Sequence, residues 1–325
     1  MAVRVFITGI TGYIGGQLAT DLSRQHPEWQ LVGLVRNIEQ AQKVVGRLPQ
    51  VQTVLGDLSS LDLLLDQARK SDIVVQAADC DNVQIVETLI KGLSQGGKGG
   101  SYIQISGSAS NIEVPNGYGQ PSSRIYDDVR DAVEITTFDS SHLHSDADQA
   151  TVREGKELGV KTALLVPCVV YGEGEGPIKK DSITFPVLEK AIIARGKGFT
   201  VGDGQNSWSG IHVKDLVSAV ILLIEDALLP HGAKMTWGVE AVYYVEAGDY
   251  VLNNAVVKLV EVLNREGLIQ SQEIEKLSDA EALSIHPYAL LMWGANSRCQ
   301  GSRLRSFGWK PAQPTFYDIL ASRLA

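Results

Sequence analysis

Cysteine, basic runs and long apolar stretches are all scarce in this sequence of 325 residues. The three cysteines, Cys80, Cys168 and Cys299, lie far apart and match no metal-ligand or redox spacing. No stretch is rich in lysine or arginine and the net charge is −9, so we expect neither nucleic acid nor an anionic membrane as a partner. The longest apolar run, Leu216–Ile224, is too short to span a bilayer.

Several enzyme signatures are missing as well. The sequence contains no phosphate loop of the G-x-x-x-x-G-K-[ST] type, no H-E-x-x-H, no G-x-S-x-G and no cluster with metal-ligand spacing, so we expect no metal. The chain enters an apolar strand pattern without a charged leader, which favours a reducing, cytoplasmic setting. An apolar content of 44% and a charged content of 21% are typical of a globular protein.

The first sixteen residues combine a strand pattern with a glycine turn. Residues 3–7 have the alternation of a short buried strand. Gly9, Gly12 and Gly15 follow at three-residue spacing, and an apolar helical pattern begins at Ile14. Strand, glycine turn and helix is the arrangement in which helix N–H groups bind the diphosphate of a dinucleotide. An ordinary tight turn is the structural alternative.

Strand and helix patterns then alternate along the first half of the chain. This alternation predicts an α/β fold with a doubly wound parallel sheet of the Rossmann type. In such folds ligands bind at the carboxyl ends of the strands. The further strands are expected at residues 31–35, 51–55, 73–77, 102–106 and 162–166, with helices at 39–46, 61–68, 81–93 and 142–158.

Two parts of the sequence interrupt this alternation. Residues 107–140 are rich in turn residues and are expected to form a long loop with one short helix at the carboxyl edge of the sheet. Later patterns predict a smaller, mixed lobe with helices at 185–194, 253–266 and 279–292 and a hairpin at 199–204. We therefore predict a discontinuous NAD(P)-binding domain of residues 1–172 plus about 208–245, and a substrate lobe of about 173–207 plus 246–325.

Taken together, these motifs resemble the extended and atypical short-chain dehydrogenase/reductases. That group includes NAD-dependent epimerases and dehydratases and the NmrA-like regulators. T-G-I-T-G-Y-I-G resembles the glycine motif of the family, and Gly56-Asp57-Leu58 resembles its adenine-contacting turn. Other segments similar to family motifs are residues 103–109, 167–172, 211–215 and 307–311. The resemblance covers nearly the whole chain and implies a nicotinamide dinucleotide as cofactor.

One residue bears on which nicotinamide dinucleotide is bound. Arg36 stands 21 residues after Gly15, at the end of the second strand, and no carboxylate follows until Glu39. An arginine at this place accommodates the 2′-phosphate of NADP, so the sequence predicts NADP(H) over NAD(H) unless Arg36 is only a solvated strand-end charge. The predicted cofactor-binding residues are Gly9, Thr11, Gly12, Tyr13, Ile14, Gly15, Arg36, Asp57, Leu58, Ala77, Ala78, Ser106, Pro167, Val169 and Val170.

The sequence departs from the family at its catalytic Tyr-x-x-x-Lys pair. None of the ten tyrosines has a lysine four residues on. In the expected alignment, Ser140 takes the tyrosine position and His144 lies near the lysine position, and the nearest substitute is Tyr126 with Arg130. Ionising a free tyrosine at pH 7 costs about 4 kcal/mol, so proton donation is easier than proton removal. The departure therefore favours reduction over oxidation or reversible epimerisation.

We consider three residues as catalytic candidates. Ser108 matches the family serine that hydrogen-bonds the substrate oxygen, with a plain turn role as the alternative. Tyr126 is a candidate proton donor. His144 is a candidate donor or base, because imidazole titrates near neutral pH, and a half-buried surface position is the alternative. The candidate substrate-pocket residues are Tyr171, Trp208 and His212, and for the first two the alternative is packing between the lobes.

The sequence thus predicts an NADP(H)-dependent oxidoreductase that reduces a small apolar or aromatic carbonyl- or imine-type substrate. Sugar nucleotides are disfavoured because the second lobe lacks an arginine cluster for a diphosphate. Two alternatives stay open: a non-catalytic NmrA-like regulator that binds NADP(H) and a partner protein, and a reductase scaffold reused as an isomerase, lyase or cyclase. Members of the family often form homodimers through two helices, but nothing in this sequence indicates a dimer.

Overall fold

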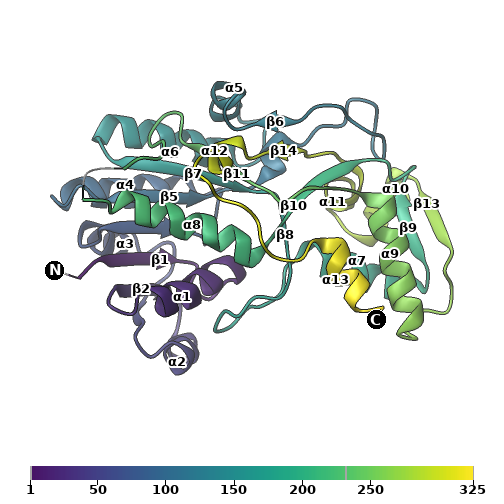
Figure 1. The fold of residues 1–325 in the computed structure, drawn as a ribbon, viewed down its shortest axis with the longest axis horizontal. Coiled ribbons are helices and arrows are strands. Elements are labelled where there is room, and N and C mark those ends of the chain that lie inside the picture. Colours follow the sequence, from purple (N-terminus) through teal and green to yellow (C-terminus); the bar gives the residue numbers. More distant parts are fainter. Residues whose placement is uncertain (1, 231–232, 325) are drawn as a thin grey trace.

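The computed structural model describes residues 2–230 and 233–324 and is built around a seven-stranded, wholly parallel sheet (Figure 1). The strand order is β11-β7-β5-β4-β1-β2-β3. After β1 the chain adds β2 and β3 on one side, and then adds β4, β5, β7 and β11 on the other side. This is the doubly wound sheet that the sequence predicts, and the prediction is confirmed. The strands are β1 (Arg4–Thr8), β2 (Gln30–Val35), β3 (Gln52–Leu55), β4 (Ile73–Gln76), β5 (Ser101–Ile105), β7 (Lys161–Pro167) and β11 (Val242–Val245).

Helices cover both faces of this sheet, because successive strand residues point to opposite sides. In β1, Val5 and Ile7 join one core cluster and Phe6 joins another. The helices α1 (Tyr13–Gln25) and α8 (Val213–Ala227) pack together on the first face. On the second face lie α3 (Leu61–Arg69), α4 (Val83–Gln95) and α6 (Ser145–Leu158), while α2 (Ile38–Arg47) contacts the outer strands β2 and β3.

A smaller lobe lies beyond the carboxyl ends of the strands and has a core of its own (Figure 1). Its centre contains Trp293 and Phe199, and the rings of Phe185 and Phe316 stack 3.6 Å apart. The boundaries between the two predicted domains stay a prediction. The elements in or beside this core are β8 (Val169–Tyr171), β9 (Gly198–Val201), β10 (Ser207–His212), β12 (Asp249–Val251), β13 (Ile274–Leu277), α7 (Thr184–Arg195), α9 (Leu252–Arg265), α10 (Asp279–Ile285), α11 (Ala289–Gly294) and α13 (Phe316–Ser322). Of these, β8 and most of β10 fall within the residues predicted for the NAD(P)-binding domain.

The long loop of residues 107–140 is tied to the edge of the large sheet. It contains the 3-10 turn η1 (Ser108–Asn111), strand β6 (Tyr126–Asp127) and helix α5 (Ala132–Thr136), and β6 pairs with β14 (Cys299–Gln300). The buried Asp128 carboxylate accepts hydrogen bonds from the backbone N–H groups of Tyr244 and Arg303, at 3.0 and 2.9 Å. The short helix α12 (Ser302–Ser306) follows. These contacts join segments that lie far apart in the sequence.

Three local predictions about secondary structure are wrong. Residues 199–204 form no hairpin, because β9 pairs in parallel with β13 and the positive φ of Gly202 and Gly204 turns the chain away. The helix expected at 142–158 begins at Ser145, because His144 adopts a left-handed conformation. The helix expected at 279–292 is divided into α10 and α11 at Pro287, since proline cannot continue the α10 hydrogen-bond pattern.

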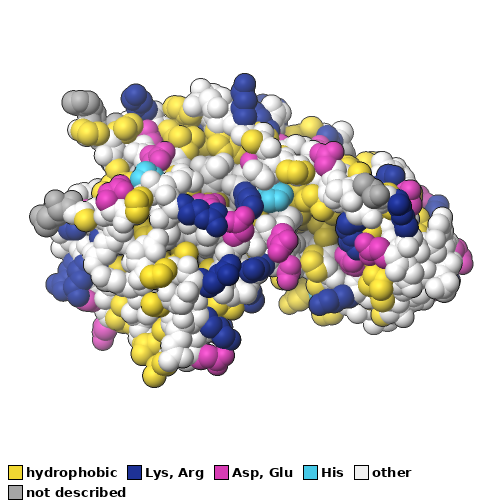
Figure 2. Space-filling view, turned by 60° about the horizontal axis from the view of Figure 1, so that its bottom comes forward, with side chains coloured by type: hydrophobic (Ala, Val, Ile, Leu, Met, Phe, Trp, Pro, Cys, Tyr) yellow, Lys and Arg dark blue, Asp and Glu magenta, His cyan; other side chains and the backbone are white. Residues whose placement is uncertain are grey.

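The charged side chains on the molecular surface are mixed, as expected for a sequence without long basic runs. On the face drawn in Figure 2, basic and acidic side chains are interspersed. Within the described part of the chain, no helix is both long and apolar enough to cross a membrane.

Candidate functional site

The glycine turn after β1 is shaped by close backbone contacts. Gly9 has a φ of +79°, and a Cβ there would lie 2.4 Å from the carbonyl oxygen of Ala77. A Cβ at Gly15 would lie 2.4 Å from the carbonyl oxygen of Gly9. Gly12 caps α1 without a side-chain hydrogen bond, so the N–H groups of the first turn are available to a ligand. This cradle fits the diphosphate of a dinucleotide.

A cavity of about 550 Å³ opens beside this turn, at the carboxyl ends of β1 to β4. Arg36, at the end of β2, reaches it, and its backbone N–H donates to Gln40 Oε1 at 3.0 Å. On the opposite side, Asp57 Oδ1 accepts hydrogen bonds from Ser59, which lower the pKa of this exposed carboxyl. The lining residues are Gly9, Thr11, Gly12, Leu34, Arg36, Gln40, Asp57, Leu58, Ser59, Ala77, Ala78 and Lys179.

A second cavity of about 590 Å³ adjoins the first one. The two share Gly12, Ala77 and Lys179, so together they form one continuous cleft. The sheet contributes the ends of β5 and β7, including Ser106, Ser108 and Pro167, which are followed by β8. The far wall comes from the smaller lobe, the long loop and the segment before α6, and its apolar part consists of Ile112, Leu143, Ile183, Trp208, Tyr288, Leu291 and Met292. Asp181, Ser182 and Thr184 add polar side chains to it.

A histidine and a carboxylate meet at the edge of the second cavity. His144 Nδ1 lies 2.7 Å from Asp81 Oδ1 and 3.4 Å from the Cys80 sulfur. A Cβ at Gly107 would lie 3.1 Å from His144 Nε2, so this other ring nitrogen faces the end of β5. Among the described residues, His144 is the sole non-glycine residue with a positive φ, at 68°. A carboxylate that orients one imidazole nitrogen and leaves the other toward a cavity is an arrangement suited to proton transfer.

Two other ionisable groups lie close to this pair. Burial and the neighbouring carboxylates raise the pKa of the Cys80 thiol to about 12, so it is neutral and unreactive at pH 7. Asp148, on α6, is almost fully buried and accepts a hydrogen bond from Ser106 Oγ at 2.8 Å. Burial raises the pKa of Asp148 to about 8, although the bond from Ser106 acts in the opposite direction. Asp148 therefore lies behind Ser106 as a mainly neutral acid.

The structure brings most of the predicted site residues to this cleft. Of the fifteen predicted cofactor-binding residues, all but Gly15 line one of the two cavities, and Gly15 packs beneath the turn against Gly9. Ser108, His144 and Trp208 line the second cavity. Three predicted residues, Tyr126, Tyr171 and His212, line neither.

Tyr126 lies in a separate apolar cluster under the long loop. Its ring packs edge-on against Phe138, and the guanidinium of Arg124 lies 4.3 Å from the ring centre. Burial raises the pKa of Tyr126 above the ordinary value of a tyrosine. Arg130 binds Asp131 and the backbone of Ile125 instead of the tyrosine. The structure therefore gives the pair Tyr126 and Arg130 no place in the cleft.

Tyr171 and His212 pack against each other behind the cleft. Their rings meet edge to face with centroids 5.8 Å apart. His212 caps α8, because its Nδ1 accepts a hydrogen bond from the backbone of Lys214 at 3.1 Å. A Cβ at Gly172 would lie 2.2 Å from His212 Nε2, so the ring fills space that only glycine leaves open. Burial lowers the pKa of His212, which favours the neutral ring.

Sequence reasoning missed four residues at the cleft. Asp81 follows β4 and meets His144 only through the tertiary fold. Gln76 is buried, and its Oε1 accepts hydrogen bonds from the N–H groups that follow β4, including that of Ala78 at 2.6 Å. Lys179 lines both cavities, and the glycine-rich sequence before it was a usable signal of a loop in close contact. Asp148 gave no signal, because a carboxylate within a helical pattern is usually exposed.

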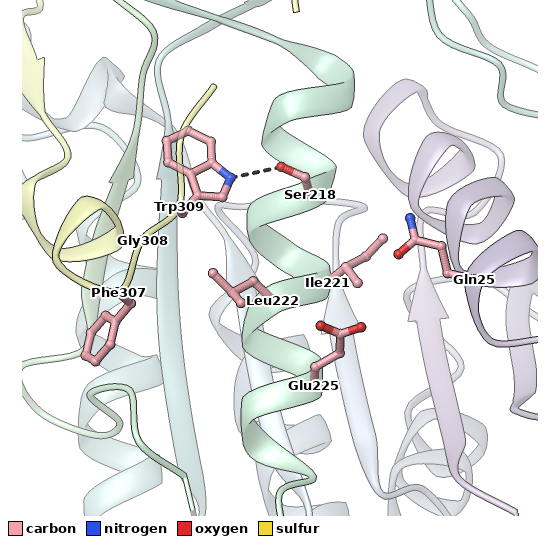
Figure 3. A pocket seen from close by; sticks show the side chains of 8 residues that line it. All are labelled: Gln25, Ser218, Ile221, Leu222, Glu225, Phe307, Gly308 and Trp309. Carbon is pink, nitrogen blue, oxygen red and sulfur yellow. Dashed lines mark hydrogen bonds between the residues drawn. The ribbon is translucent and has the colours of Figure 1, made fainter. Parts of the chain in front are cut away.

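A further hollow of about 290 Å³ lies at the other end of α1 from the glycine turn. Figure 3 shows Ser218 and Leu222 on α8 facing the carboxyl-terminal segment around Trp309, while Ile221 lies on the side of α8 toward Gln25. Trp309 Nε1 donates to Ser218 Oγ at 2.9 Å. This contact fixes the segment 307–311 to α8, and the hollow contains none of the candidate catalytic residues.

The fold and the cleft together define a Rossmann-type dinucleotide-binding protein with a smaller second lobe. A model of the NAD dependent epimerase/dehydratase family matches residues 5–235, and the chain belongs to this family. The expected superfamily is thereby confirmed, and membership makes the chain an oxidoreductase-like NAD(P)-binding protein.

Known proteins similar to this chain include a fungal oxidase and several sugar-nucleotide dehydratases. The oxidase ucsJ of an Acremonium species is 30% identical over 332 residues, covering 97% of this chain and 94% of the relative. The dTDP-glucose 4,6-dehydratase DesIV of Streptomyces venezuelae, solved with NAD bound, is 18% identical with a TM-score of 0.69, covering 99% of this chain and 96% of that one. The dTDP-glucose 4,6-dehydratase of Bacillus anthracis, solved with NAD, is 17% identical with a TM-score of 0.68 and the same coverage. At these identities the two structures show the fold alone.

Proposed function

We propose that the protein is an NADP(H)-dependent oxidoreductase that reduces a small, apolar carbonyl- or imine-type substrate. The observation that carries this proposal is the continuous cleft. It has a glycine turn and Arg36 at one end, and an apolar cavity with Ser108 and His144 at the other. A bound nicotinamide dinucleotide would supply hydride to a substrate held in the apolar cavity.

The preference for NADP(H) rests on the side chains around Arg36. Arg36, at the end of β2, lines the first cavity. The carboxylate of Asp57 lines it too, but this carboxylate accepts hydrogen bonds from Ser59 in the turn after β3. An arginine with a free face attracts a phosphate more strongly than a ribose hydroxyl. The similar dehydratase structures were solved with NAD, so Arg36 is the residue on which a different preference depends.

The reacting end offers a hydrogen-bond donor and a proton donor. In this proposal Ser108, which lines the second cavity, donates a hydrogen bond to a carbonyl oxygen and so polarises the carbonyl for hydride addition. His144 gives the oxygen its proton from Nε2, while Asp81 holds the other ring nitrogen. The substrate gains one hydride and one proton and becomes an alcohol. His144 then regains its proton from solvent, beside the exposed Asp81 carboxylate.

The apolar far wall supports an apolar substrate. Leu143, Ile183 and Met292 offer no hydrogen-bond partner for a sugar hydroxyl, which leaves Asp181, Ser182 and Thr184 as the polar side chains of this part of the cavity. Among the described residues, no arginine lines the second cavity. A nucleotide sugar would leave its diphosphate without such a partner. The oxidase name of the Acremonium relative is consistent with redox chemistry on this fold.

The test begins with binding and continues with turnover. Calorimetric titration of the protein with NADPH, NADP⁺, NADH and NAD⁺ should give the tightest binding for the phosphorylated forms. Nicotinamide absorbance is then followed with a panel of apolar ketones, enones and imines. We expect consumption of NADPH that is lost in Ser108→Ala and in His144→Gln, with cofactor affinity retained in both variants.

Two results would contradict the proposal. Absence of binding by all four nucleotides would remove the cofactor and the enzyme assignment together. Tight binding that distinguishes oxidised from reduced cofactor, without turnover of any substrate in the panel, would favour the NmrA-like regulator. Ser110→Ala, a buried serine that does not line the cleft, is the matched control for Ser108→Ala.

A further inference from the structure

The loop between β8 and α7 is fastened across the first turns of α1 (Figure 1). We call residues 173–182 the strap. The backbone N–H of Gly174 donates to the carbonyl oxygen of Lys180 at 2.8 Å, which closes the strap into a compact loop. Gly174 packs closely on Tyr13, since a Cβ there would lie 3.1 Å from the tyrosine ring. The strap is therefore a defined structure and not a loose connection.

Contacts with α1 fix the position of the strap relative to the glycine turn. The backbone N–H of Glu175 donates to Gln17 Oε1 at 2.6 Å, and Tyr13 donates to the carbonyl oxygen of Gly172 just before the strap. A Cβ at Gly16 would lie 3.2 Å from the Cα of Gly176, so the two backbones pack directly. The strap thus lies over the helix end that would hold the diphosphate.

Two charged residues of the strap, Glu175 and Lys179, point in different directions, and Asp181 of the strap lines the second cavity together with Lys179. Glu175 pairs with Lys214 at 2.6 Å and with Arg24 at 2.5 Å, and these partners lower its pKa to about 2. Lys179 forms no ion pair within the described part of the chain and lines both cavities where they meet. Gly12, the residue that caps α1, lies at the same junction. One cation of the strap is therefore directed at the middle of the cleft.

We propose that Lys179 is the cation that neutralises the diphosphate of the bound dinucleotide from the strap side. The proposal rests on the proposed function, because it needs a dinucleotide in the cleft. A dinucleotide that places its adenosine in the first cavity and its nicotinamide in the second must pass its diphosphate through their junction. There the helix N–H groups meet one face of the diphosphate and the Lys179 ammonium meets the other.

Two lysines that are neighbours in the chain provide a matched test. Lys179→Gln and Lys180→Gln remove the same charge from adjacent exposed positions, and Lys180 lines neither cavity. The probes are NADPH, ADP-ribose, which keeps the diphosphate, and adenosine 2′-monophosphate, which lacks it. We expect Lys179→Gln to raise the Kd of NADPH and of ADP-ribose about tenfold and to leave that of adenosine 2′-monophosphate unchanged. Lys180→Gln should change none of the three by more than about twofold.

The possible outcomes separate this inference from the proposed function. If the wild-type protein binds NADPH but both variants bind ADP-ribose equally well, the role of Lys179 is overturned and the proposed function stands. If Lys179→Gln weakens adenosine 2′-monophosphate as much as ADP-ribose, Lys179 serves the adenosine end and the diphosphate assignment is wrong. If the wild-type protein binds no probe, both proposals fail. Melting temperatures of both variants equal to that of the wild-type protein would show that neither perturbs the fold.

Discussion

The two ends of the cleft differ in which part of the chain forms them: backbone shapes one end, and side chains line the other. At the nucleotide end, the shape comes from backbone: a Cβ at Gly9 or Gly15 would meet a carbonyl oxygen at 2.4 Å. At the other end, which we call the reacting end, the proposed chemistry rests on side chains that distant turns bring together, above all Asp81 and His144. A backbone cradle tolerates few substitutions, whereas a pair of side chains can be replaced by another pair. On the proposed function, this difference accounts for a chain that keeps the glycine motif of its family without the Tyr-x-x-x-Lys pair.

The backbone end should be broken most completely by a side chain at Gly15. Gly15→Val must push the glycine turn away from α1, so we expect loss of at least about a hundredfold in NADPH affinity and destabilisation by about 2–4 kcal/mol. Gly46→Val is the control, because a Cβ at Gly46 meets no atom within 4 Å. Calorimetry and thermal denaturation measure the two effects. Similar results for the two variants would show that the close contact does not shape the site.

The side-chain end should lose its chemistry without losing its ligand. His144→Gln is expected to lower kcat by about 10²–10⁴-fold with the Kd of NADPH unchanged, because it removes proton transfer alone. Asp81→Asn should have a smaller effect in the same direction, because it disturbs only the orientation of the ring. Steady-state kinetics with a substrate found in the panel checks both variants. A normal kcat in His144→Gln would assign the proton to another group.

The backbone of His144 provides a second readout for the same residue. At a φ of 68°, alanine is strained and glycine is not, so His144→Gly should be about 1 kcal/mol more stable than His144→Ala. Both variants lack the imidazole and should be equally inactive. If the two variants have the same free energy of unfolding, the backbone at residue 144 can leave the left-handed conformation without cost, and His144 is not held in a strained conformation.

At the nucleotide end, the side chain of Arg36 is expected to make the backbone cradle selective for NADPH over NADH. Arg36→Ala should reduce the preference for NADPH over NADH by about ten- to a hundredfold, with NADH affinity little changed. Arg47→Ala is the control, because it removes the same charge from an exposed site on α2 that does not line the cavity. An unchanged ratio in Arg36→Ala would refute the predicted preference for NADP(H).

The parts of the molecule that the sequence predicts correctly are those encoded by short stretches. The parallel sheet follows from local apolar runs, and the glycine turn from three residues at fixed spacing. His144 was reached through a family alignment, but its partner Asp81 could not be, because the contact joins the turn after β4 to the start of α6. Tyr126 shows the opposite case, in which a local spacing suggests a pair that the fold places outside the two cavities. Its spacing to Arg130 imitates a catalytic pair, yet both side chains serve the packing of the long loop.

The last prediction concerns the stability of the fold rather than activity, at Asp148 under the reacting end. Its pKa rises from 3.8 to about 8 in the fold, so the folded state holds this proton more tightly than the unfolded state does. Stability should therefore fall as the pH rises from about 4 to 8, and Asp148→Asn should remove part of that fall, with a gain of roughly 1–3 kcal/mol at pH 9 and none at pH 4. Asp146→Asn, on the exposed side of α6, should leave the pH profile unchanged. Thermal denaturation across this range decides the point, because equal profiles for the two variants would mean that the Asp148 carboxylate finds water or a cation once the reacting end opens.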